Sequence, residues 1–139
     1  MADSGKRMLN SGLTVETWGN ISARDPDSGL IYLTPSAMGY DVICEDDIVT
    51  AGIDVSIAEG KRSPVVEFEL HPGIYRSRPE INAIVHTHPV YSQIFGVLRG
   101  PIPALIGEAA QARTIGTPCL LEQIRIDYMS GFALHRYGR

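Results

Sequence analysis

Cysteine is scarce in this chain of 139 residues, which contains two, Cys44 and Cys119. They are far apart and form no C-x-x-C pair, so the sequence favours neither a disulfide framework nor a zinc site built from thiolates. We expect both thiols to be reduced and buried, as is usual in a cytoplasmic protein.

Long apolar runs and excess basic charge are also missing. No segment is apolar over the length needed to span a bilayer, and the N-terminal residues lack the apolar stretch of a signal peptide. The net charge of −4 disfavours binding to nucleic acids or anionic membranes. We therefore expect a cytoplasmic protein that binds neither nucleic acids nor membranes.

The composition is that of a globular domain, with 44% hydrophobic and 20% charged residues. A chain of this length suits one domain over residues 1–139. No internal repeat or low-complexity segment interrupts it.

Two histidines stand where a predicted strand gives way to a predicted helix. Ile84-Val85 favours a short buried strand that ends at His86 and His88. Residues two apart on a strand point to the same side, so both imidazoles would leave one face together. Pro89 suits the first turn of a helix over Val90–Leu98. Two converging imidazoles near a carboxylate could bind a divalent metal, although a bare His-x-His also occurs as ordinary polar residues in loops.

A carboxylate and a third histidine precede this strand. Ser63-Pro64 fits the N-cap and first position of a helix that would hold Glu67 in its first turns. His71 lies four residues further on and would share the face of Glu67. Pro72-Gly73 is unfavourable inside a helix, so we expect a kink there.

The N-terminal half predicts a hairpin with polar turns at one end. Strands are expected over residues 21–25 and 30–33, joined by a turn at 26–29. Gly19-Asn20 precedes the first strand and Thr34-Pro35-Ser36 follows the second. Their backbone N–H groups, amide and hydroxyls could together bind an anion, or they could be plain turns.

The remaining elements are predicted from short local patterns. We expect helices at 2–9 and 108–113, a turn or helical piece at 41–47, strands at 48–51 and weakly near 57–58, and an extended stretch at 102–106. Residues 120–126 fit a strand or a helix equally well.

Five motifs in register resemble the class II aldolase/adducin family. They extend from about residue 9 to about residue 113 and comprise Gly19-Asn20-Ile21-Ser22, Leu33-Thr34-Pro35-Ser36, Pro64-x-x-Glu67 with His71, Ala83-Ile84-Val85-His86-Thr87-His88-Pro89, and Ile102-Pro103-Ala104. The family includes sugar-phosphate aldolases, ribulose-phosphate 4-epimerases and decarboxylases.

The resemblance implies both a fold and a chemistry. The fold would be a three-layer α/β/α domain with a largely antiparallel central sheet, usually assembled as a homotetramer with its site at a subunit interface. The chemistry would be a lyase reaction through a metal-stabilised enediolate or enolate, with zinc, or alternatively manganese, as the metal. His86 and His88 would be two of three histidine ligands, and Glu67 a further ligand or the acid/base. Asn20 and Ser36 would hold the anionic group of the substrate.

The chain departs from the aldolase pattern near the substrate. Val65 and Val66 replace two serines whose hydroxyls would bind a phosphate, and Ala37 replaces a glycine. Gly107 and Glu108 stand where the aldolases have a tyrosine that donates a proton. The resemblance therefore favours a carboxylate or another small oxygenated substrate over a sugar phosphate.

The C-terminal part differs most. Residues 132–138 resemble the strand that carries the family's last metal histidine, and in that strand Tyr137 would stand at the position of the histidine. His135, two residues earlier, could replace it as a ligand or be an ordinary residue of the C-terminal segment. We expect residues after about 113 to be divergent or incomplete, and the apolar surface left by missing helices to be covered in an oligomer.

Three functions follow from the resemblance. The first is a metal-dependent lyase of the aldolase or decarboxylase type, and the second a sugar-phosphate 4-epimerase with the same metal site. The third is a non-catalytic assembly domain like the head of adducin, which has no need of metal-binding histidines. Because His86 and His88 are both present, the sequence favours an enzyme.

Overall fold

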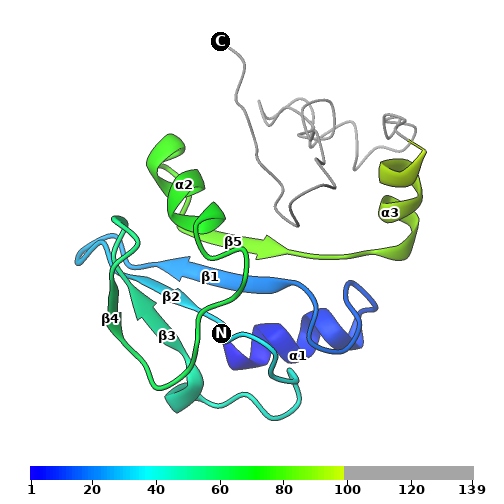
Figure 1. Cartoon of the computed structure of the whole chain (residues 1–139), viewed down its shortest axis with the longest axis horizontal. Coiled ribbons are helices and arrows are strands. Elements are labelled where there is room, and N and C mark those ends of the chain that lie inside the picture. Colours follow the sequence, from blue (N-terminus) through cyan, green and yellow to red (C-terminus); the bar gives the residue numbers. More distant parts are fainter. Residues whose placement is uncertain (99–139) are drawn as a thin grey trace. The chain divides into compact units, whose positions relative to one another are not determined.

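The computed structural model describes residues 1–98 (Figure 1). The chain divides into two compact units, Met1–Pro89 and the residues from Val90 onward, and each is described by itself. The described part of the second unit contains the helix α3 (Val90–Val97). A single domain over 1–139 stays a prediction.

A five-stranded sheet forms the centre of the first unit. Its order is β4-β3-β2-β1-β5, and every neighbouring pair is antiparallel. The strands are β1 (Asn20–Arg24), β2 (Ile31–Leu33), β3 (Val49–Ala51), β4 (Ile57–Glu59) and β5 (Ala83–His86). The predicted antiparallel sheet and its first hairpin are confirmed.

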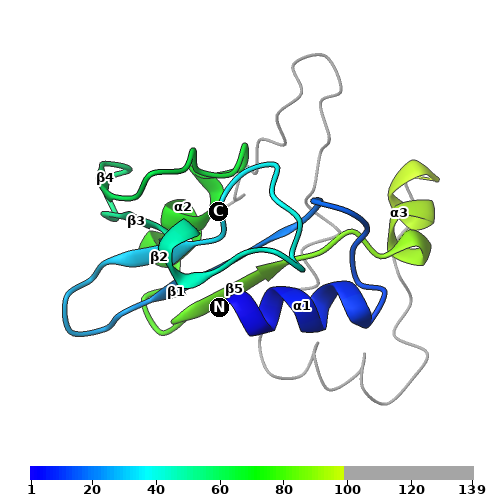
Figure 2. The same ribbon diagram turned by 90° about the horizontal axis from the view of Figure 1, so that it is seen from below.

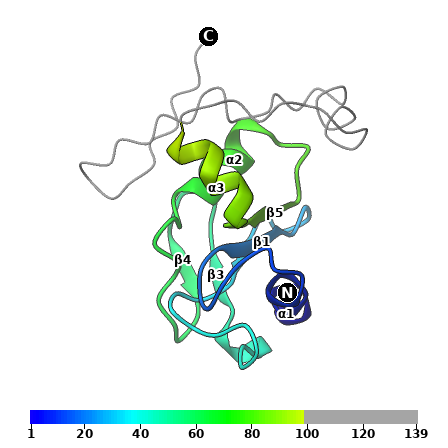
Figure 3. The same ribbon diagram turned by 90° about the vertical axis from the view of Figure 1, so that its right-hand side faces the viewer.

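Helices cover both faces of this sheet. The helix α1 (Ala2–Asn10) runs along β1, and α2 (Leu70–Ser77) lies on the other side of β1 and β5 (Figures 2 and 3). Met8 packs with Ile21, Tyr40 and Ile43 in one hydrophobic cluster. The other cluster contains Ile31, Leu33, Ala51, Val65, Phe68 and Tyr75. The three-layer α/β/α arrangement is confirmed.

Strand alternation decides which side chains face α2. Ile21 points to the α1 cluster, so Asn20 and Ser22 point to the opposite face. His86 is the register partner of Asn20 on β5, and directly opposed residues share a face. The sheet therefore presents Asn20, Ser22 and His86 to the side of α2.

The predicted helix start at Ser63-Pro64 is wrong. Pro64 instead forms an isolated bridge with Pro35, and Glu67 lies in successive turns that precede α2. Because α2 begins only at Leu70, Pro72 falls in its first turn, where a missing N–H is tolerated. For this reason, the expected kink inside a longer helix is absent from α2.

Two burial predictions are also wrong. Ile84-Val85 does not form a buried strand, because β5 is an edge strand among the described residues and Val85 is 55% exposed. Cys44 is exposed, since it stands before the short 3₁₀ helix η1 (Glu45–Asp47), where its thiol donates to Asp47. Cys119 lies outside the described residues.

Other local predictions agree with the structure to within one or two residues. They concern the helices at 2–9 and 90–98, the helical piece within 41–47 and the strands at 48–51 and near 57–58. The predictions for residues 99–139, which include His135 and Tyr137, lie outside the described residues. No helix among the described residues is long and apolar enough to cross a membrane.

Candidate active site

The two predicted metal ligands come together at the end of β5. Nε2 of His86 lies 2.8 Å from Nε2 of His88, and the ring centroids are 4.7 Å apart. The backbone N–H of His88 donates to the carbonyl of Leu13, which holds the chain beyond the strand. Trp18 contacts the His88 ring edge-on at a centroid distance of 5.6 Å.

This pair of nitrogens fits a divalent metal. Two nitrogens that each lie about 2.05 Å from a tetrahedral zinc ion are about 3.3 Å apart, so a small rotation of either ring would suffice. Within residues 1–98, however, no three His, Cys, Asp or Glu side chains are close enough to form a metal-binding group. The structure thus brings His86 and His88 together without placing Glu67 in the same group.

Glu67 is connected to the sheet through Asn20. The Asn20 amide nitrogen donates to Oε2 of Glu67 at 3.2 Å, and its Oδ1 lies 2.5 Å from Nε2 of His71. Asn20 is 1% exposed and His71 is fully buried. Since Asn20 is the register partner of His86, Glu67 stands on the same side of the sheet as the histidine pair.

The network continues behind His71. Nδ1 of His71 lies 2.7 Å from Oγ of Ser22, which in turn lies 2.8 Å from the hydroxyl of Tyr75. Burial, and secondarily the charge of His86, lower the pKa of His71 from its ordinary value of 6.5 to about 4. His71 is therefore neutral at pH 7 and carries one ring proton. Burial raises the pKa of Tyr75, which stays protonated.

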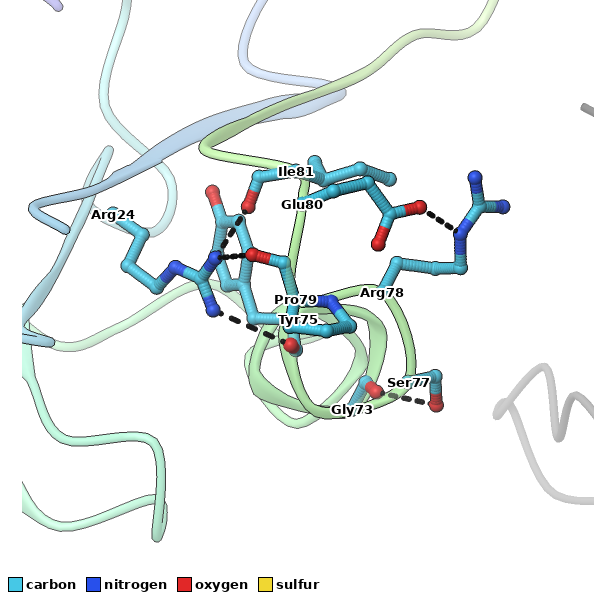
Figure 4. Close-up of polar contacts among 8 residues, drawn as sticks. All are labelled: Arg24, Gly73, Tyr75, Ser77, Arg78, Pro79, Glu80 and Ile81. Atoms are coloured by element: carbon cyan, nitrogen blue, oxygen red, sulfur yellow. Dashed lines mark hydrogen bonds and ion pairs between the residues drawn. The ribbon is translucent and has the colours of Figure 1, made fainter. Parts of the chain in front are cut away.

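Arg24 holds the other side of Tyr75 and the chain that leads into β5. Its guanidinium lies 5.2 Å from the centroid of the Tyr75 ring and donates to the Tyr75 carbonyl (Figure 4). It also donates to the carbonyls of Pro79 and Ile81 and to the side chain of Asn82. One cation thus connects β1, α2 and the segment before β5.

The predicted anion-binding turns are adjacent in space. The Thr34 hydroxyl accepts the Ile21 N–H, and the Ser36 N–H donates to the carbonyl of Ser63. Ala37 has a φ of +53°, in the left-handed region, which explains why glycine suits this position. Thr34 therefore connects the turn after β2 to the start of β1, and Ser36 stands two residues further along that turn, next to the segment that contains Ser63.

The sequence analysis gave no role in the site to three members of this network, namely Ser22, Arg24 and Tyr75. A signal was present in the alternation of β1, where polar side chains stand at 20, 22 and 24. Three polar residues on one face of a central strand predict a buried network. Tyr75 is four residues after His71, one helical turn away.

Comparisons with known proteins agree with this architecture. A profile of the "Class II Aldolase and Adducin N-terminal domain" family matches residues 1–135. The chain belongs to the class II aldolase and adducin family.

Individual relatives in this family are enzymes by name. The chain is 40% identical over 101 residues to a 5-deoxy-D-ribulose 1-phosphate aldolase of Bacillus thuringiensis, covering 73% of the chain and 47% of that protein. It is 32% identical over 103 residues to an L-ribulose-5-phosphate 4-epimerase of Salmonella paratyphi B, covering 74% and 45%. A solved L-fuculose 1-phosphate aldolase superposes with a TM-score of 0.71 at 37% identity, covering 74% and 49%. The chain spans about half the length of these class II aldolase relatives.

Proposed function

We propose that this chain carries the metal site of a lyase of the aldolase type that acts on a small oxygenated substrate. The observation that carries this proposal is the convergence of His86 and His88 at 2.8 Å, on the same side of the sheet as Glu67, whose carboxylate accepts a hydrogen bond from the buried Asn20. Membership of the family and the names of two aldolase relatives support it.

Each site residue receives a role that its position allows. His86 and His88 would hold a divalent metal through their Nε2 atoms, and imidazole ligands favour zinc, or else manganese, over magnesium. When bound, such a metal acts as a Lewis acid toward substrate oxygens and so favours breakage of the adjacent C–C bond. Glu67 would be a further ligand or move a proton to or from the substrate. Ser36 would hold the anionic group of the substrate. Asn20, whose buried amide bonds Glu67 and His71, would add at most its second N–H proton.

The substrate proposal depends on Val65 and Val66. Val65 lies in the hydrophobic core, whereas Val66 is 68% exposed and presents methyl groups instead of a hydroxyl. Fewer hydroxyls near the site reduce the hydrogen bonds available to a phosphate. We therefore propose a carboxylate or another small polar substrate, although the named relatives act on sugar phosphates.

A second candidate reaction is epimerisation of a sugar phosphate. The Salmonella relative named as an epimerase favours it, at 32% identity. Cytoplasmic location and assembly as a homotetramer are further proposals, which rest on the family resemblance.

The experiment uses the full chain, purified without chelator and supplied with zinc or manganese. It is incubated with aldol products of hydroxy acids and with sugar 1-phosphates and 5-phosphates. Released aldehydes are measured by a coupled assay and epimers by NMR. We expect aldehyde release that falls at least about a hundredfold in His86→Ala and Glu67→Gln. Ile43→Val, in the opposite cluster, serves as the control for stability.

Epimer formation without aldehyde would replace the lyase proposal with the second candidate. Absence of any turnover by metal-loaded protein, or equal turnover by His86→Ala, would contradict both reactions. An assembly domain like the head of adducin would then be the better explanation.

A further inference from the structure

The hydrogen bonds of the buried network on the α2 side of β1 all donate in the same direction along the chain of side chains. It joins five side chains in the order Tyr75, Ser22, His71, Asn20 and Glu67, with separations of 2.8, 2.7, 2.5 and 3.2 Å. Four of these residues are buried, and the fifth, Glu67, is partly exposed. At its end stands the carboxylate to which we assign catalysis.

The chemistry of the groups fixes which atom donates at each step. A carboxylate accepts hydrogen bonds, so the side of Asn20 that faces Glu67 is the NH₂ group and the side that faces His71 is the oxygen. An amide oxygen only accepts, so Nε2 of His71 carries the proton. With one ring proton at Nε2, Nδ1 of His71 must accept from Ser22, and Ser22 accepts from Tyr75.

Reversing any member would leave two donors or two acceptors face to face. If Asn20 turned its amide by 180°, its oxygen would face the carboxylate and its NH₂ group would face the protonated Nε2 of His71. An unmatched polar pair in a buried site is strongly unfavourable. The orientation of Asn20, and with it the donor presented to Glu67, therefore depends on the proton at Nε2.

We propose that His71 is a positioning residue that holds Glu67 in place through Asn20, and that Ser22 and Tyr75 fix the tautomer in which His71 does so. His71 touches neither the substrate nor the metal in this proposal. Its effect on metal binding rests on the proposed function, whereas the hydrogen-bond directions do not.

Two substitutions at His71 separate positioning from simple stability. The amide nitrogen of glutamine reaches about as far as Nε2 of histidine, so His71→Gln can still donate to Asn20 while it loses the bond to Ser22. Asparagine reaches about as far as Nδ1, so His71→Asn keeps a partner for Ser22 and loses Asn20. Each variant loses one of two buried hydrogen bonds, and a structural role alone predicts similar losses of stability.

The first readout is NMR of the metal-free full chain. Long-range ¹H–¹⁵N spectra report the tautomer of His71, which we expect to be protonated at Nε2. Exchange of the Asn20 side-chain NH₂ protons with solvent should be slow in the wild type and in His71→Gln, and fast in His71→Asn. Protonation at Nδ1, or equal exchange in the two variants, would overturn the proposal.

The second readout is the dissociation constant for cobalt(II), used as a spectroscopic substitute for zinc. Loss of a residue that orients a ligand typically weakens metal affinity by about 10- to 100-fold. We expect that loss in His71→Asn and a change below about threefold in His71→Gln. Equal weakening in both variants, or none in either, would overturn the proposal.

The two readouts distinguish this proposal from the proposed function. A wild type that binds no cobalt(II) but shows Nε2 protonation and slow Asn20 exchange would refute the metal site and support the positioning role. A wild type that binds cobalt(II) with His71 protonated at Nδ1 would support the metal site and refute the positioning role.

Discussion

Replacing Gly19 with alanine should disturb the end of β5 where the histidine pair lies. Gly19 has a φ of +73°, and a Cβ built on it would lie 2.5 Å from the backbone oxygen of His86. The left-handed conformation costs a non-glycine residue roughly 1–2 kcal/mol. The contact must lengthen by more than half an ångström, and such overpacking costs about 1–3 kcal/mol more.

Gly29→Ala is the matched control for this substitution. Gly29 has the same φ of +73°, but a Cβ there meets nothing within 4 Å. Gly19→Ala should therefore lower the free energy of unfolding by about 1–3 kcal/mol more than Gly29→Ala, measured by urea denaturation of metal-free protein. It should also weaken zinc binding, whereas Gly29→Ala should not. Equal destabilisation with unchanged zinc affinity in both variants would refute the reasoning.

Three further predictions concern the parts that support the site. Arg24→Met should lower the unfolding free energy by about 3 kcal/mol, because two partly buried carbonyls, those of Tyr75 and Ile81, lose a charged donor, and urea denaturation would detect it; a loss below about 1 kcal/mol would contradict the stabilising role of these hydrogen bonds. Hydrogen bonds from Cys44 and Arg62 lower the pKa of Asp47 to about 2, so the stability it contributes is present above pH 3.8 and lost as the pH falls toward 2. Thermal melts between pH 5 and pH 2 should show this loss in the wild type and a flatter profile in Asp47→Asn. Val65→Ser should destabilise the chain by about 2–3 kcal/mol in urea, while Val66→Ser should change stability by less than about 0.5 kcal/mol, because only Val65 is buried; similar effects of the two would contradict the assigned burial.

Much of the fold can be predicted from local sequence. The hairpin follows from alternating apolar residues around a turn at 26–29, and the strand into His86 follows from Ile84-Val85. The start of α2 could not be predicted in this way. Ser63-Pro64 satisfies the rules for a helix start, but Pro64 is engaged in a bridge with Pro35, a partner distant in sequence.

The candidate site also contains one part that local sequence predicts and another part that it does not. The convergence of His86 and His88 depends on a spacing of two along one chain segment, and it could be predicted. The network through Ser22, Asn20 and Tyr75 depends on the packing of α2 against β1. Such tertiary contacts have no local signature beyond the polar alternation of the strand.

The most direct test of the metal site is elemental analysis of the full chain, purified without chelator, for the wild type, His86→Ala and Cys44→Ser. Cys44 is an exposed thiol that could bind zinc adventitiously, so its variant is the control. The account predicts about one zinc or manganese ion per chain in the wild type and in Cys44→Ser, and a loss of that metal in His86→Ala. Absence of metal from the wild type, or its retention in His86→Ala, would contradict the assignment of His86 and His88 as metal ligands.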